Sequence, residues 1–357
     1  MEKVVYLLGA GASYGLRDES GSMKYEAVFP HVDGTVSRIR SECANIIEGL
    51  PIVSELPDRM RFKSSQIIKR RATVGVSSPF HDKLDKLFKD LVWAQKESAR
   101  HSTIDTFAKK LWLQNNWDDF NRLKRVLTAY FLLEQSSDLV DKRYDSFLAS
   151  ILGDNSGDFP ANVSILSWNY DCQFELAYSE YVKDAGINEV EGLLHFNHKS
   201  VNSIIPYNGF NIIKINGSAL YYNDENSIKI VDPFGGLDEM NKMDFVASIF
   251  ADSMKNKCAL SFAWEQMDDL FKNRMRSVIK DASILVVIGY SFPFFNREID
   301  RLLFGSLPYL RKVYIQDMFP DKIEESVNNL LSFRPGGIRP KIIKIYDTKQ
   351  FYLPPEL

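Results

Sequence analysis

The sequence contains little cysteine. Its 357 residues include three, Cys43, Cys172 and Cys258, and no two of them lie close together. This spacing excludes a disulfide framework, and it excludes a zinc ribbon, because that site needs paired CxxC motifs. We therefore expect a cytoplasmic protein that binds no metal ion.

Long apolar runs and an excess of one charge are also missing. The apolar stretch at the N-terminus is too short for a signal peptide, and no later stretch approaches the roughly 20 apolar residues that cross a bilayer. Lys and Arg number 44 against 47 Asp and Glu, which gives a formal net charge of −3. The sequence therefore predicts no association with membranes and no direct binding of nucleic acid, although a local basic patch stays open.

Apolar, β-branched segments are present, and amphipathic segments separate several of them. The segments that favour strands are 4–8, 163–168, 212–215, 284–288, 313–316 and 342–346. Apolar residues at helical spacing occupy 267–279 and 297–304. This alternation predicts an α/β fold with a Rossmann-like, doubly wound parallel sheet. Residues 223–227 favour the turn of a hairpin that decorates this sheet.

A helical pattern lies between the first two predicted strands. From residue 79 onward, apolar residues recur at three- and four-residue spacing. They are Leu84, Leu87, Phe88, Leu91, Ile104, Phe107, Ala108, Leu111, Leu123, Val126, Leu127 and Tyr130. We predict one domain over residues 1–357, in which 1–16 and 160–357 form a Rossmann-like core and 79–155 form an inserted helical lobe.

Two predicted strands end in turns that suit a nucleotide. Residues 9–13 follow the first strand, and glycines there allow a sharp bend and close approach to a pyrophosphate. A tight connection is the alternative, since Tyr14 stands where GxGxxG has its third glycine. Asn169 and Asp171 follow the second strand, at the edge where parallel sheets bind ligands. Helix capping accounts for one of these two residues but not for the pair.

Three later strands end in residues of the same kind. These residues are Asn216, Gly217, Ser218, Gly289, Tyr290, Ser291 and Asp317. Small residues in such turns admit a ribose or a phosphate against the backbone, and a carboxylate can accept hydrogen bonds from a ribose diol. For Asp317, a solvated loop acid is an equal alternative.

Together these segments resemble the SIR2-like family. GAGAS at 9–13, SWNYD at 167–171, KINGS at 214–218 and IGYSFP at 288–293 occur in that family's order. STIDTF at 102–107 is similar to the S-I-D-x-F element of its prokaryotic defence members. The resemblance implies a Rossmann-like NAD fold with a helical insertion, which agrees with the strand and helix pattern.

The resemblance also implies roles for individual residues. Asn169 would lie beside the nicotinamide ribose and orient a water or hydroxyl, and Asp171 would fix that loop and the nicotinamide amide. Asp105 would contribute from the helical lobe, with helix capping as its alternative. The residues implied for the pyrophosphate are Gly9, Ala10, Gly11, Ala12 and Ser13. Those implied for the rest of the nucleotide are Gly217, Ser218, Gly289, Tyr290, Ser291 and Asp317.

The implied activity is hydrolysis of NAD to nicotinamide and ADP-ribose. Bacterial members resembling this chain deplete NAD in defence against phage. The resemblance further implies regulation by homo-oligomerisation or by a second protein, such as an ATPase or a nucleic-acid-guided protein. No GxxxxGK[ST] motif supports hydrolysis of ATP. The family's deacylases hold zinc on four cysteines, and the three scattered cysteines here cannot supply that site, which argues against protein deacylation.

One position departs from the family pattern. Asn216 stands where the family has a histidine that acts as a base on a ribose hydroxyl, and an amide takes no proton at neutral pH. His195 and His198 precede this turn and offer substitutes, with a surface or a core-packed histidine as the alternative. The sequence therefore leaves two functions open: an NAD glycohydrolase, and a subunit that binds NAD or ADP-ribose without cleaving it.

Overall fold

The computed structural model divides the chain into two compact units. The sheet unit comprises Met1–Phe29, Asp138–Tyr221 and Ala259–Leu357, and the helical unit comprises Pro30–Ser137 and Tyr222–Cys258. The residues that the structure describes are 2–13, 90, 93–94, 97–98, 100–101, 103–135, 141–182, 185–198, 209–224, 227–230, 257–335 and 339–357. None of the described helices is long and apolar enough to span a membrane.

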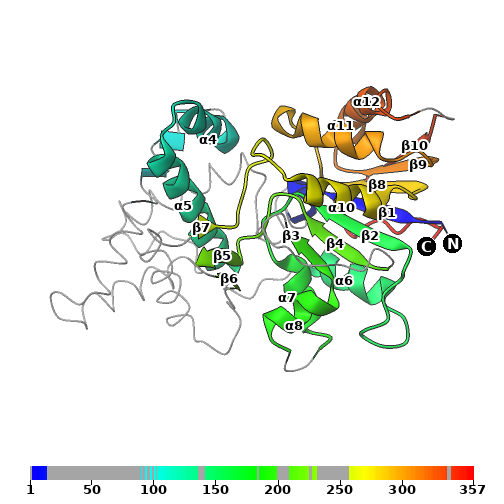
Figure 1. Ribbon diagram of the computed structural model, residues 1–357. Helices are drawn as coiled ribbons and strands as arrows, with labels where there is room; N and C mark the ends of the chain where they lie inside the picture. Colours follow the sequence, from blue (N-terminus) through cyan, green and yellow to red (C-terminus); the bar gives the residue numbers. More distant parts are fainter. Residues whose placement is uncertain are drawn as a thin grey trace, which may run out of the picture. The chain divides into compact units, whose positions relative to one another are not determined.

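The sheet unit is built on a seven-stranded parallel sheet (Figure 1). Its strands are β1 (Val4–Leu8), β2 (Val163–Ser167), β3 (Phe196–His198), β4 (Asn211–Lys214), β8 (Ile284–Ile288), β9 (Lys312–Gln316) and β10 (Lys341–Ile345). They are ordered β10-β9-β8-β1-β2-β4-β3. The expected fold class is confirmed. The six expected strands are all present within one residue of their expected bounds at either end, and β3 is an addition.

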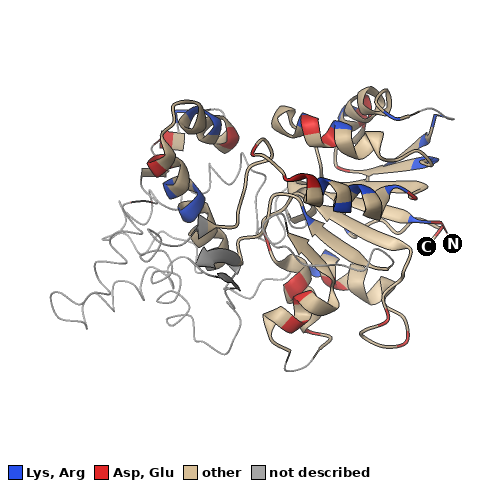
Figure 2. Ribbon diagram, viewed as in Figure 1, with Lys and Arg blue, Asp and Glu red and all other residues tan. Residues whose placement is uncertain are grey.

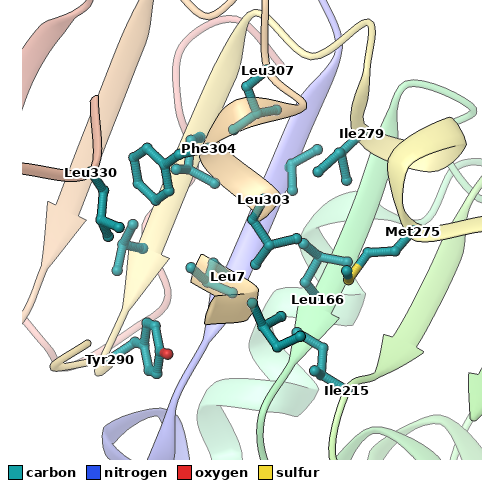
Figure 3. Packing of buried hydrophobic residues seen from close by; sticks show 14 of the residues in the cluster. Leu7, Leu166, Ile215, Met275, Ile279, Tyr290, Leu303, Phe304, Leu307 and Leu330 are labelled. Atoms are coloured by element: carbon teal, nitrogen blue, oxygen red, sulfur yellow. The ribbon is translucent and has the colours of Figure 1, made fainter. Parts of the chain in front are cut away.

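Helices cover both faces of this sheet, as a doubly wound fold requires. On one face, alternate strand residues pack against α10 (Asp269–Ile279), α11 (Arg297–Gly305) and α12 (Pro320–Leu331). The other alternate residues pack against α6 (Lys142–Ile151), α7 (Gln173–Ser179) and α8 (Ile187–Leu193). Figure 3 shows Leu7, Leu166 and Ile215 gathered on the first face. Met275 of α10 and Leu303 of α11 belong to the same cluster.

The central strands are uncharged, whereas an edge strand carries lysines. β1, β2 and β8 contain no Lys, Arg, Asp or Glu (Figure 2). β1 and β8 are continuous apolar runs and β2 adds only two serines, and all three strands are buried throughout, which is typical of parallel strands covered on both faces. Lys341 and Lys344 lie on β10, at the edge of the sheet. Charged side chains on an edge strand oppose pairing with other chains.

The helical unit contains α4 (Ile104–Leu113), α5 (Trp117–Gln135) and a three-stranded sheet. That sheet has the order β6-β5-β7, with β5 at Tyr221–Asp224, β6 at Ser227–Ile230 and β7 at Lys257–Cys258. The expected hairpin strands are thus neighbours, but they join β7 in a separate sheet and do not decorate the main one. The expected helical residues Leu84, Leu87, Phe88 and Leu91 lie outside the described part of the chain.

The order of the strands creates a switch point between β1 and β8. After β1 the chain builds β2, β3 and β4 on one side, and it later builds β8, β9 and β10 on the other. Loops at the carboxyl ends of β1 and β8 therefore lead in opposite directions along the sheet. In open α/β sheets, ligands bind in the crevice formed at such a point. This topology marks the edge at which a site is expected.

Candidate functional site

The glycine turn after β1 packs directly against the loop after β8. Gly11 N donates to Gly289 O at 2.9 Å, and Gly9 N donates to Ile288 O at 3.0 Å. A Cβ added at Gly9 would lie 2.5 Å from Gly289 O. Gly289 has a φ of +57°, in the left-handed region that favours glycine. The contact between these two backbones therefore requires glycine on both sides of the switch point.

This contact changes the role expected for the glycine turn. The N–H groups of Gly9, Gly11 and Ala12 all donate to carbonyl oxygens of the protein, the last of them to Gly9 O. They are therefore engaged within the fold in this arrangement. The N–H of Ala10 is not among them, and Ala10 is partly exposed. The turn itself forms a short 3-10 helix, η1 (Ala10–Ser13), and the residues that follow it lie outside the described part of the chain.

Asn169 is fixed at the carboxyl end of β2. Its Nδ2 donates to Gly9 O at 2.9 Å and to Ser13 Oγ at 3.1 Å, and its N–H donates to Ser167 Oγ at 3.1 Å. The residue is buried, with 8% of its surface exposed. Because both amide hydrogens are used, Oδ1 is the remaining acceptor, and no hydrogen bond among the described residues involves it. Asn169 thus presents an oriented carbonyl oxygen beside the switch point.

Ser13 connects Asn169 to a buried carboxylate and a tyrosine. Its Oγ donates to Asp171 Oδ2 at 2.7 Å and lies 2.7 Å from Tyr144 OH. Since its one proton goes to Asp171, Ser13 accepts from both Asn169 and Tyr144, and its hydroxyl is saturated. Burial, reinforced by the charge of Asp171, raises the pKa of Tyr144 well above its ordinary value. The Ser13 hydroxyl therefore fixes this network and has no proton left for a phosphate.

Asp171 braces the loop that follows β2. Its Oδ1 accepts a hydrogen bond from Gln173 N at 3.2 Å, at the start of α7, while Oδ2 accepts from Ser13. The buried Lys214 Nζ donates to the backbone oxygen of Asp171. Both carboxylate oxygens therefore contact protein groups. These contacts hold the loop in place, which is one of the two roles that the resemblance implies for Asp171.

Two residues of this network come from α6 and were not singled out by the sequence pattern. Besides Tyr144, Arg143 reaches the glycine turn, where Nη2 donates to Ala12 O at 2.8 Å. Arg143 is buried and pairs with Asp141, which caps α6. The expected helical lobe included these residues, whereas the structure packs α6 on the sheet. The signal in the sequence was an arginine next to the apolar face of a helix. That pattern does not tell which group the arginine contacts.

Asn216 lies beside the β2 loop and has an unused oxygen. Its Nδ2 donates to Trp168 O at 3.3 Å. Its buried Oδ1 accepts no hydrogen bond from the described residues. Gly217 has a φ of +77°, and a Cβ there would lie 2.1 Å from Ala259 O, so this turn also requires glycine. Ser218 is fully buried, and its Oγ accepts from Leu220 N within the turn.

Three of the residues expected around the rest of the nucleotide take different positions. Tyr290 is buried, stacks on Trp168 at a centroid distance of 5.6 Å and donates to Asp300 Oδ1 at 2.8 Å. Ser291 is exposed. Asp317 is partly exposed, and its Oδ1 accepts from Phe319 N at 2.8 Å, so that it braces its own loop. Tyr290 therefore joins the β2 and β8 loops through its packing.

Neither candidate histidine is a partner of Asn169. His198 is 2% exposed, and burial lowers its pKa to about 3. Its Nε2 lies 3.5 Å from Glu191 Oε1. His195 is exposed on its turn, with Nδ1 3.1 Å from Phe210 O. The core-packed alternative thus describes His198, and the surface alternative describes His195.

His198 belongs to a buried cluster of charges that includes Lys214. Lys214 Nζ lies 3.4 Å from Glu175 Oε1, and all four side chains are at most 6% exposed. Burial raises the pKa of Glu175 to about 7 and that of Glu191 to about 8, against the opposing ammonium of Lys214. At neutral pH, Glu191 and His198 therefore form a neutral acid and a neutral imidazole.

Asp105 belongs to the helical unit, in the first turn of α4. Thr103 is the N-cap of this helix: its Oγ1 accepts from Thr106 N at 3.1 Å.

No protein-family model matches the chain, and no curated protein matches it. The likeness to SIR2-like proteins therefore stays a prediction from sequence motifs. Among the described residues, His, Cys, Asp and Glu form no group of three able to hold a metal ion. The case for a function accordingly depends on the geometry at the carboxyl edge of the sheet.

Proposed function

We propose that this chain binds NAD at the carboxyl edge of the seven-stranded sheet and hydrolyses it to nicotinamide and ADP-ribose. The observation that carries the proposal is the fixed amide of Asn169. Its two donated hydrogen bonds leave Oδ1 as an oriented acceptor beside the switch point between β1 and β8. An acceptor fixed before the substrate arrives needs no reorganisation during the reaction.

The proposed reaction suits a site of oriented oxygens. The bond between C1′ of the ribose and the nicotinamide nitrogen breaks, and its electron pair leaves with the neutral nicotinamide. Positive charge then develops on the ribose, and the carboxylate of Asp171 and the carbonyl of Asn169 would stabilise it in a largely water-excluded environment. Water adds to C1′ and loses a proton, which gives ADP-ribose. Asn169 Oδ1 would accept a hydrogen bond from this water or from a ribose hydroxyl.

Asn216 limits the expected rate. An amide can orient a hydroxyl but cannot accept its proton, and general-base help is typically worth about 10²–10⁴ in rate. A dissociative cleavage does not depend on that help, because the leaving group departs neutral. We therefore expect slow turnover, with kcat below that of a variant in which the base is restored.

The test is a product assay with matched variants. Purified protein is incubated with NAD, and nicotinamide and ADP-ribose are separated and quantified. We expect both products from the wild type, and at least a tenfold loss in the Asn169→Ala variant. The exposed helix residue Asn273 supplies the control, since Asn273→Ala removes the same amide elsewhere on the sheet unit. Absence of both products across protein concentrations that permit assembly would refute hydrolysis.

Asn216 also favours a second candidate, a subunit that binds NAD or ADP-ribose without turnover. This function predicts saturable binding in calorimetric titration and no product in the assay above. The Asn216→His variant distinguishes the two. If the wild type binds but is silent and Asn216→His releases nicotinamide, the chain is a binding subunit that lacks its base.

Regulation and biological role follow the family resemblance. We infer that assembly with further copies of the chain, or with a second protein such as an ATPase or a nucleic-acid-guided protein, controls turnover in the cytoplasm. Depletion of NAD would then stall a bacterial cell infected by phage. Cellular NAD measured before and after induction of the wild type and of Asn169→Ala tests this role. Equal NAD levels in both cultures, also during infection, would contradict it.

A further inference from the structure

We propose that Tyr144 and Arg143, at the start of α6, are positioning residues that hold the amide of Asn169 in its orientation. The inference deepens the proposed function and rests on it, because it concerns the same site. Asn169 Nδ2 donates to Gly9 O at 2.9 Å and to Ser13 Oγ at 3.1 Å. Both acceptors belong to the glycine turn. The direction of the Asn169 carbonyl therefore depends on what fixes that turn.

Tyr144 fixes the side chain of the turn that accepts from the amide. Its hydroxyl lies 2.7 Å from Ser13 Oγ, and Ser13 in turn donates to Asp171 Oδ2 at 2.7 Å. The Tyr144 ring packs edge-to-face on Phe174 and Phe351, at centroid distances of 4.7 and 4.9 Å. The phenol stays protonated, because burial raises its pKa well above the ordinary value. It therefore donates to Ser13 from a fixed place, and the Ser13 hydroxyl is held from both sides.

Arg143 fixes the backbone of the same turn. Its Nη2 donates to Ala12 O at 2.8 Å, and its guanidinium also donates to both carboxylate oxygens of Asp141. The N–H of Asp141 donates to Gln173 Oε1 at 2.7 Å. Gln173 N donates to Asp171 Oδ1 at 3.2 Å, in the loop after β2. The start of α6 is thus bonded to the glycine turn and to the loop after β2, the two segments that the amide joins.

Burial separates positioning from direct contact with a ligand. Tyr144 is 1% exposed and Arg143 is 4% exposed, which leaves almost no surface for a substrate. An effect of either residue on the reaction must therefore pass through the turn and Asn169. A fixed acceptor matters most where charge develops, which is in the transition state. Loss of the Tyr144 hydroxyl should accordingly lower kcat for NAD and leave KM unchanged, whereas a purely structural role would lower the free energy of unfolding alone.

The first experiment is a double-mutant cycle on NAD cleavage by the full-length protein. Tyr144→Phe removes one hydroxyl and keeps the ring, and we expect kcat to fall about threefold to tenfold with KM unchanged within about twofold. In the Asn169→Ala background the same substitution should change kcat by less than about twofold, because the group that it positions is gone. Arg143→Lys keeps a charge opposite Asp141 but lacks the guanidinium fork that also reaches Ala12 O, so it should act in the same direction as Tyr144→Phe.

Tyr178→Phe is the matched control for the loss of a buried hydroxyl. Tyr178 lies in the same hydrophobic core as Tyr144, and its OH donates to Ser156 O at 2.7 Å, away from the glycine turn. Its kcat should stay within about twofold of the wild type. An equal loss of kcat in Tyr144→Phe and Tyr178→Phe overturns the inference. So does a loss that is the same with and without the Asn169 amide.

A second measurement tests the positioning without turnover. Both hydrogens of the Asn169 side-chain amide are donated within buried contacts, so they should exchange slowly with water. NMR of the isotope-labelled protein identifies this amide by its absence in Asn169→Ala. Tyr144→Phe should speed its exchange at least about threefold. The buried amide of Asn211, which donates to Gly209 O, is the internal control and should not change.

The outcomes separate this inference from the proposed hydrolysis. Faster exchange at Asn169 alone supports the positioning role even if NAD is never cleaved. Cleavage of NAD by Tyr144→Phe with wild-type kcat and unchanged Asn169 exchange overturns the positioning role and leaves hydrolysis standing. Faster exchange at Asn169 and Asn211 together also overturns it, because the hydroxyl of Tyr144 would then stabilise the fold as a whole.

Discussion

At Gly289 the backbone of the β8 loop passes so close to the glycine turn that no side chain fits between them. A Cβ there would lie 2.4 Å from the backbone carbon of Gly11. The neighbour is backbone, so it cannot rotate away, and the positive φ adds strain. We expect Gly289→Ala to lower the free energy of unfolding by about 2–4 kcal/mol. Urea denaturation followed by circular dichroism measures this change.

Gly192 provides the control for that substitution. It lies in α8, and a Cβ there would meet no atom within 4 Å. Gly192→Ala should stabilise the protein by about 0.4–1 kcal/mol, because alanine restricts the unfolded chain and favours helix. Equal stability of Gly289→Ala and the wild type would show that the two loops do not pack as closely as the structure has them.

The sequence indicates some residues of the candidate site better than others. Asn169 and Asp171 could be predicted because both follow an apolar strand, and the carboxyl ends of parallel strands collect ligands. Tyr144 could not, since its contact with Ser13 joins positions 131 residues apart. The turn alone predicts a phosphate contact for Ser13, whereas its hydroxyl is saturated by three side chains. The local sequence pattern identifies which polar groups lie near the end of a strand. It does not identify which of these groups form hydrogen bonds with one another.

At the scale of elements, α8 and β3 hold a pH-dependent contact. Burial raises the pKa of Glu191 from an ordinary 4.5 to about 8, with His198 on β3 as its neighbour. A carboxyl whose folded pKa lies above its unfolded pKa contributes stability that is fully present below pH 4.5. That contribution is lost as the pH rises through about 8. Glu191→Gln stays neutral at every pH, so we expect it to be increasingly more stable than the wild type as the pH rises from 5 to 9.

Thermal unfolding of the two proteins across this pH range measures the effect. The difference in Tm should grow by several degrees between pH 5 and pH 9, since each unit of pKa difference corresponds to about 1.4 kcal/mol at most. The difference in Tm between the two proteins cancels the contribution of His198, because both proteins contain it. That contribution has the opposite sign, since the lowered pKa of His198 destabilises the fold as the pH falls below 6.5. Glu189→Gln, at an exposed position of the same helix, is the control and should follow the wild type. Parallel Tm curves for Glu191→Gln and wild type would mean that Glu191 is ionised in the folded protein.

The strands and helices could be predicted where their sequence patterns were long. Five-residue apolar runs gave β1 and β8 with their observed bounds, because such runs suit strands buried on both faces. The three residues of β3 carry too little pattern to stand out. The amphipathic pattern of α6 was visible, but an apolar face does not say which surface covers it. The pattern alone therefore places α6 in the inserted lobe, although the helix packs on the sheet.

At the scale of the whole molecule, the candidate site depends on the order of strands that are far apart in sequence. β8 pairs with β1 in register from Val4 opposite Ile284 to Leu8 opposite Ile288. β2 pairs with the other side of β1, from Val4 opposite Val163 onward. The alternation of strands and helices predicts a parallel sheet, but many strand orders satisfy it. The order places the glycine turn between the loops after β2 and β8, and that placement assembles the site.

If the site lies at this edge, ADP-ribose should protect the backbone there and nowhere else in the sheet. Hydrogen exchange measured by mass spectrometry, with and without ADP-ribose, tests this expectation. Slower exchange should appear over residues 9–13, 168–171 and 216–218, where loops meet at the carboxyl ends of β1, β2 and β4. The strand starts at Val4, Val163 and Ile284 lie at the opposite edge and provide the internal control. Ligand contact at the amino edge would slow exchange at those strand starts first. Uniform slowing across the sheet would reflect a general gain in stability on binding and would not locate the ligand. Slowing that begins at the strand starts would contradict a site at the switch point, because a ligand bound there covers the loops at the carboxyl ends of the strands.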